Sequence, residues 1–240
     1  MKHIISSLGI TIASLLSAQN SLAQESWMIP NFFISSRTFE YSVVHGNVRG
    51  QINSLGGGVT GIVEQRFYID LSGERNISTT EESIINGLHN TIEFERSDIA
   101  ASIGYAVNDS ISTFVGYKYG KSTLTELDFS PLAGAKTSLE GQGPFIGAGG
   151  GWKVKDWGTV SFSAAYAKMT TTYNSHSLGT TKGDASGTSL RIKWKAPLTN
   201  NLFYDLSLIR HDYYYENFQK LDSDISEQIL SFRLGISYRF

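Results

Sequence analysis

Cysteine is absent from this 240-residue chain, and proline occurs at only 4 positions. Without thiols the protein can form no disulfide, no thiolate metal site and no lipidated N-terminal cysteine. Long hydrophobic runs are missing as well. A transmembrane helix needs about 20 apolar residues, and no segment of the sequence approaches that length. We therefore expect a fold that is stabilised without covalent cross-links and without membrane-spanning helices.

The N-terminal residues 1–23, MKHIISSLGITIASLLSAQNSLA, have the parts of a secretory signal peptide. A basic start is followed by an apolar run from Leu8 to Leu16 and by a small-x-small cleavage site that ends at Ala23. Cleavage removes one basic residue and no acidic one, which leaves 19 Lys and Arg against 22 Asp and Glu, a net charge of -3. That balance gives no reason to expect a nucleic-acid partner.

Apolar and polar residues alternate along much of the remaining sequence. In the C-terminal stretch ILSFRLGISYRF, the alternate positions from Leu230 to Phe240 are all apolar, and those between them are small or polar. Successive side chains of a strand point to opposite faces, so the pattern predicts a strand between two different environments. Similar segments recur upstream and predict ten strands. The most N-terminal segment is expected to turn Phe39, Tyr41 and Val43 outward.

The connectors between these segments alternate between short and long. Tight turns are expected near Glu64, Asp109, Asp156 and Pro197, and long polar loops at about 73–90, 121–143, 168–187 and 212–226, with a shorter one at 46–53. A membrane barrel must close on itself, and it typically has short periplasmic turns and long outer loops. We predict an all-β fold, a transmembrane antiparallel up-and-down β-barrel of about ten strands formed by residues 37–240, with 24–36 as an N-terminal periplasmic segment.

Aromatic residues fall at two levels of this predicted barrel. The inner level holds Tyr105, Trp152, Trp194 and Tyr204, together with Phe39, Tyr238 and Phe240, and the outer level holds Tyr117, Tyr119, Tyr166 and Tyr213. Aromatic girdles of this kind are expected where a barrel crosses the two membrane interfaces.

With its signal peptide, its alternating segments and the final YRF, the chain resembles bacterial outer-membrane β-barrel proteins of the small OmpA/OmpX-like type. The resemblance implies export to the outer membrane of a Gram-negative cell. In that group, a last strand ending in Phe with an aromatic two residues earlier is the signal for the barrel-assembly machinery, which assigns this role to Tyr238 and Phe240. The implied partners are this machinery, periplasmic chaperones, outer-membrane lipid and lipopolysaccharide.

Charged residues of both signs lie on the predicted inward face of the strands. They are Glu40, Asp70, Asp98, Lys118, Arg191, Lys193, Asp205, His211, Arg233 and Arg239. We interpret them as a salt-bridge network that fills a narrow barrel, because buried charges must be paired. A narrow channel for small solutes is the alternative, although Phe114, Phe145 and Phe203 also point inward. Inward Gly147, Gly149 and Gly151 are expected to leave space for long neighbouring side chains.

Histidines and acids at the outer rim are the candidates for chemistry. His45, His89, His176 and His211 fall near outer strand ends without the spacing of metal ligands. The segment RHDYYYE invites comparison with outer-membrane proteases of the omptin type, but His211 and Asp212 are adjacent and face opposite sides of a strand. We expect no metal, no cofactor and no catalytic residues.

The expected function is therefore a structural or adhesion-like role through the extracellular loops, which include an exposed aromatic cluster from Tyr213 to Tyr215 and could contact a surface ligand. A narrow channel and a hydrolase with a site at the outer rim are the alternatives.

Deleting Phe240 should reduce insertion into the outer membrane far more than the loop substitution Ser177→Ala. The deletion removes both the implied assembly signal and a member of the inner girdle. Heat-modifiable, folded protein in purified outer membranes measures the effect, and equal yields for the two variants would contradict the prediction.

Overall fold

The computed structural model describes residues 27–43, 46–63, 66–77, 79–85, 88–127, 135–176, 179–220 and 224–240. The expected signal peptide lies outside these residues. The strands are β1 (Trp27–Val43), β2 (Gly46–Val63), β3 (Phe67–Asn76), β4 (Thr79–Ile85), β5 (Leu88–Ala106), β6 (Ile111–Glu126), β7 (Lys136–Lys153), β8 (Thr159–Ser175), β9 (Gly179–Pro197), β10 (Leu202–Glu216) and β11 (Ile225–Tyr238), with one 3-10 turn, η2 (Lys155–Trp157). In the described part of the chain, no helix has the length and apolar character needed to span a bilayer.

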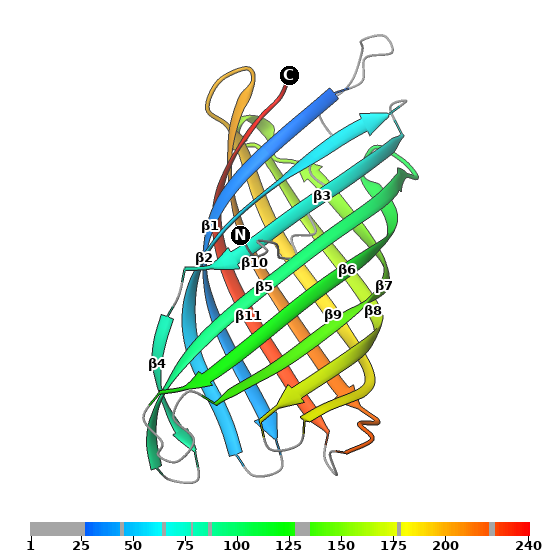
Figure 1. The fold of residues 1–240 in the computed structure, drawn as a ribbon. Helices are drawn as coiled ribbons and strands as arrows, with labels where there is room; N and C mark the ends of the chain where they lie inside the picture. The colour runs from blue at the N-terminus through cyan, green and yellow to red at the C-terminus, as the bar shows by residue number, and fades with distance from the viewer. Residues whose placement is uncertain are drawn as a thin grey trace.

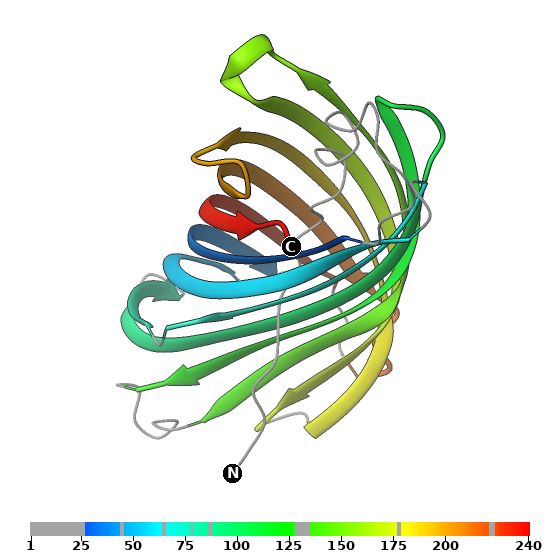
Figure 2. The ribbon, with the colours of Figure 1, turned by 90° about the horizontal axis from the view of Figure 1, so that it is seen from above.

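All strands pair antiparallel with their neighbours, and the sheet closes on itself (Figure 1). β1 pairs with β11 from Asn31–Ser237 to Ser42–Ser226. β3 and β4 pair with successive parts of β5, so together they occupy one strand position. The closed ring therefore has ten strand positions, which confirms the predicted fold class. Figure 2 views the ring from the end that carries the C-terminus.

The tight connections gather at one end of the barrel, called here the short-turn end, which is uppermost in Figure 1. They join β2 to β3, β5 to β6, β7 to β8 and β9 to β10, at the four places expected from the sequence. Both ends of the described chain lie there as well, because the Phe240 amide donates to the Met28 carbonyl oxygen at 3.2 Å. The opposite end is called the long-hairpin end.

Residues 27–36 belong to β1, so the expectation that 24–36 forms a periplasmic segment is wrong for this part. Phe32 and Ile34 point outward and are exposed, whereas Asn31 and Ser35 point inward and are buried. The backbone of this segment pairs with both β2 and β11. The barrel wall therefore begins ten residues earlier than predicted.

The long polar loops expected from the sequence are mostly paired strands. The β8–β9 ladder, for example, continues from Lys168–Ser186 to Ser175–Gly179, inside the expected loop 168–187. Backbone hydrogen bonds do not require an apolar face, so a ladder can continue where the apolar alternation stops. The hairpins therefore extend the barrel wall itself.

The face of the barrel wall that carries apolar side chains changes from the outer to the inner one along the barrel. Near the short-turn end the outward side chains are apolar and exposed, as on β11 from Leu230 to Tyr238; this zone is called the apolar belt. Toward the long-hairpin end the buried inward side chains are apolar, including Ile52, Phe94 and Ile229, and this zone is called the core zone. Such a reversal suits lipid around the belt and water around the core zone.

Two expectations on β1 fail because of this reversal. Phe39 and Tyr41 point inward and are 1% and 5% exposed, although the sequence pattern placed them outward. Glu40 between them therefore points outward and does not belong to the lumen charge network. The alternation was read correctly, but its apolar face is the inner one in this zone.

Gly147 on β7 should tolerate no side chain. A Cβ there would lie 2.3 Å from Cζ of Phe114 and 2.5 Å from the carbonyl oxygen of Ala164. We expect Gly147→Ala to destabilise the folded barrel by about 1–3 kcal/mol, as is usual for overpacking. Gly61→Ala is the matched control, because a Cβ at Gly61 meets no atom within 4 Å. Urea unfolding in detergent micelles measures both, and equal midpoints would contradict the prediction.

Candidate functional site

The barrel interior holds most of the charged residues predicted to line the lumen. Asp70, Asp98, Lys118, Arg191, Lys193, Asp205 and Arg233 are all buried there. Arg239 lies at the short-turn end and is half-buried. Lys193 Nζ lies 3.4 Å from Asp205 Oδ2, and Asp70 accepts a hydrogen bond from Thr60 Oγ1 at 2.7 Å.

Six of the interior charges form a connected series of alternating sign, called here the charge chain. In order they are Arg233, Glu74, Arg37, Asp98, Arg96 and Glu227. The distances include 3.3 Å from Arg37 Nε to Glu74 Oε1 and 3.2 Å from Arg37 Nη2 to Asp98 Oδ2. Because its members come from β1, β3, β5 and β11, the charge chain connects strands that are far apart in sequence.

The sequence reasoning missed five buried interior charges: Arg37, Glu74, Arg96, Lys195 and Glu227. The alternation of inward and outward positions along each strand could have identified two of them. Arg37 continues the inward series that starts at Asn31 and Ser35, and Lys195 continues the series of Arg191 and Lys193. Glu227 and Arg96 lie closer to the core zone, where the apolar face has already changed sides, so apolar alternation alone assigns them no partner.

A second polar group surrounds His211 on β10. Its Nδ1 lies 2.6 Å from Ser189 Oγ and 3.2 Å from the Tyr213 hydroxyl, and its ring stacks on that of Tyr213. Lys118 Nζ donates to the Tyr213 hydroxyl at 2.6 Å. Among the described atoms, His211 Nε2 has no hydrogen-bond partner. A serine and a histidine in contact could in principle act as nucleophile and base, but here both are almost fully buried.

The outer rim differs from the expectation in one respect. Tyr213 and Tyr215 are buried, and Tyr214 alone of the three is exposed, so the expected cluster of exposed tyrosines is wrong. Neighbouring positions of a strand face opposite sides, so Tyr213 and Tyr215 point into the core zone while Tyr214 points outward. Asp212 faces outward and pairs with Arg210 Nε at 2.8 Å, on the side of the wall opposite to His211.

Most aromatic residues expected in the girdles occupy outward positions of the wall: Tyr105, Trp152, Trp194, Tyr204, Tyr117, Tyr119 and Tyr166. Phe39 and Tyr213, which were expected there too, point inward and are buried. Tyr238 and Phe240 at the C-terminus are exposed, and their ring centroids lie 4.8 Å apart.

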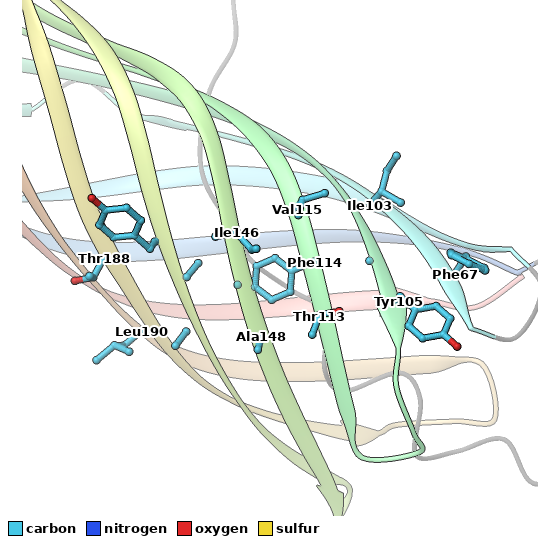
Figure 3. A pocket seen from close by; sticks show the side chains of 15 residues that line it. Phe67, Ile103, Tyr105, Thr113, Phe114, Val115, Ile146, Ala148, Thr188 and Leu190 are labelled. Carbon is cyan, nitrogen blue, oxygen red and sulfur yellow. The ribbon is translucent and has the colours of Figure 1, made fainter.

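The outward wall also carries an apolar groove of about 790 Å³ across β5 to β9 (Figure 3). Large side chains such as Ile103, Val115 and Ile146 line it together with the small Ala148 and Ala164. The groove lies in the apolar belt, where such side chains suit contact with lipid tails. Across the described residues, His, Asp and Glu form no group of three that could hold a metal ion.

No protein-family model and no curated protein matches the chain. Among solved structures, the outer membrane protease OmpT from Escherichia coli superposes with a TM-score of 0.64 at 10% identity, covering 93% of this chain and 100% of that one. The translocator domain of the autotransporter NalP from Neisseria meningitidis gives a TM-score of 0.52 at 13% identity, covering 95% and 92%. At these identities the likeness concerns the fold, which is that of bacterial outer-membrane β-barrels.

Glu74 should be essential for stability because it bridges two arginines. Glu74→Ala leaves Arg37 and Arg233 buried without this carboxylate, and we expect a loss of about 3–5 kcal/mol. Glu95→Ala removes the exposed pair with Arg75 and should cost about 1 kcal/mol or less. Urea midpoints of the folded proteins test this. A Glu74 variant as stable as the Glu95 variant would show that the charge chain does not hold the barrel together.

Proposed function

We propose that the chain is an outer-membrane barrel closed to solutes, which acts as a surface-contact protein through the outer wall of its core zone. One observation carries the proposal. The strands continue beyond the apolar belt as a paired wall that is polar outside and apolar inside. A rigid wall of this kind, standing outside the lipid, offers a surface for contacts rather than a pathway for transport.

The orientation follows from the same features. The short turns and both ends of the described chain lie together, as expected for the periplasmic side of an outer-membrane barrel. The long-hairpin end would then face the exterior. The belt would contact outer-membrane lipid and lipopolysaccharide, and Tyr238 and Phe240 would engage the assembly machinery during insertion.

The outer wall of the core zone carries charges of both signs. Lys121 with Glu140 and Arg210 with Asp212 form ion pairs there. Lys168, which lies at an exposed position of the same wall, adds a positive charge near the edge of the belt. Polar, mixed charge suits reversible contact with lipopolysaccharide, extracellular matrix or another cell surface.

Closure to solutes is supported by what fills the interior. The charge chain crosses the barrel. Phe39, Tyr41 and Phe94 pack together on its long-hairpin side, with 4.0 Å between the ring centroids of Phe39 and Phe94. We expect no stable unitary conductance in planar bilayers. Conductance on the scale of general porins would make the channel alternative the leading one.

We also propose that the protein is not an enzyme. Ser189 and His211 are 7% and 2% exposed, so a macromolecular substrate would have little access to the serine hydroxyl. At the rim, Asp212 is engaged by Arg210. Loss of a hydrolytic activity on replacing His211 or Asp212, with folding unchanged, would overturn this part of the proposal.

Reversing charges on the outer wall should weaken surface contact without affecting assembly. We expect the double variant Lys168→Glu, Arg210→Glu in proteoliposomes to bind lipopolysaccharide-coated and matrix-coated surfaces several-fold less well than the wild type. Replacing residues 128–134, which connect β6 to β7 in the sequence, by a shorter linker tests this connector in the same assay.

The matched control is Lys153→Glu, an exposed charge at the opposite, short-turn end. It should bind like the wild type. Equal retention of all variants, each shown to be folded by heat modifiability, would mean that the outer wall is not the contact surface.

A further inference from the structure

The buried interior of the barrel carries more positive than negative side chains. In the described residues, seven buried cations (Arg37, Arg96, Lys118, Arg191, Lys193, Lys195 and Arg233) stand against five buried carboxylates (Asp70, Glu74, Asp98, Asp205 and Glu227). The charge chain itself is balanced, since it alternates in sign. The excess therefore lies outside it, and a bound anion would offset it.

One of these buried cations, Lys195, lies at the mouth of the barrel at the short-turn end, where the half-buried Arg239 adds a further positive charge. Lys195 on β9 and Arg239 near the C-terminus flank the ring of Phe203, with 4.6 Å from Lys195 Nζ and 5.9 Å from the Arg239 guanidinium carbon to the ring centroid. The same guanidinium lies 4.8 Å from the centroid of the Trp27 ring. Both cations thus lie against the same aromatic ring, and the aromatic side chains help to fix their positions.

Neither Lys195 nor Arg239 forms an ion pair among the described residues. The nearby Asp205 forms its ion pair with Lys193 and acts on Lys195 only at longer range. Arg239 donates to the Asn200 carbonyl oxygen at 3.3 Å, but its Nε has no hydrogen-bond partner among the described atoms. Lys195 is 7% exposed, so its charge is largely removed from bulk water.

We infer that this mouth is a binding site for a small soluble oxyanion, such as a phosphate or sulfate group, held by Lys195 and Arg239. A tetrahedral oxyanion can accept charge-assisted hydrogen bonds from an ammonium and a guanidinium at once. It would also neutralise the repulsion between the two cations. The rings of Trp27 and Phe203, on which the cations lie, would border the ligand. In the orientation proposed above, the site opens to the periplasm.

Calorimetric titration of the folded, full mature chain in detergent micelles with inorganic phosphate, at constant ionic strength, tests the inference. We expect saturable binding to the wild type. Lys195→Gln and Arg239→Gln should each raise the dissociation constant by about tenfold or more, as expected for the loss of one charge-assisted hydrogen bond. Lys136→Gln, which removes an exposed charge at the start of β7, should leave the dissociation constant unchanged.

A wild type without saturable binding, or variants that all bind alike, would overturn the inference. If Lys195→Gln fails to fold, Lys195→Arg, which keeps the positive charge, should still bind phosphate. Arg239 is only half-buried, so Arg239→Gln then tests the loss of a cation. Glu25 stands two residues before Trp27 in the sequence and supplies a further control. Phosphate binding that becomes tighter in Glu25→Gln would identify this carboxylate as the occupant and would also overturn the inference.

Discussion

Closure of the sheet between β1 and β11 is the constraint on which the other features of the barrel depend. These strands, the first and last of the described chain, pair from Asn31–Ser237 to Ser42–Ser226 and leave neither edge free. In lipid a free edge would leave backbone N–H and C=O groups without partners, at a cost of several kcal/mol each. Once the ring is closed, inward side chains that are distant in sequence, such as Glu74 and Arg233, are brought into contact.

The surroundings of the closed ring then decide which face of each strand is apolar. In the belt, the outward face meets lipid and polar side chains collect inside. In the core zone, the outward face is polar and the interior is filled by residues such as Phe39, Phe94 and Ile229. The charge chain lies between the mainly polar interior of the belt and the apolar interior of the core zone. The barrel therefore combines a membrane-type half and a half that resembles a water-soluble protein.

Filling the interior requires close fits as well as paired charges. Aromatic rings lie over positions without a side chain, as Phe114 does at Gly147, and a Cβ there would meet both the ring and a neighbouring backbone. The same crowding keeps Ser189 and His211 away from solvent. At the short-turn mouth, Lys195 and Arg239 both lie against the ring of Phe203, and neither forms an ion pair among the described residues.

The sequence by itself determined the ten-stranded barrel, the positions of its tight turns and most of the belt, because alternation and turn residues are local signals. It also assigned Asp70, Asp98 and Arg233 to the interior. Only the tertiary structure decided that the outer hairpins continue as strands, that Phe39 and Tyr41 point inward, and that Arg37 joins Glu74 to Asp98. The physical reason is that these features depend on what surrounds a strand and on which distant strands face it across the barrel, and neither is encoded in local periodicity.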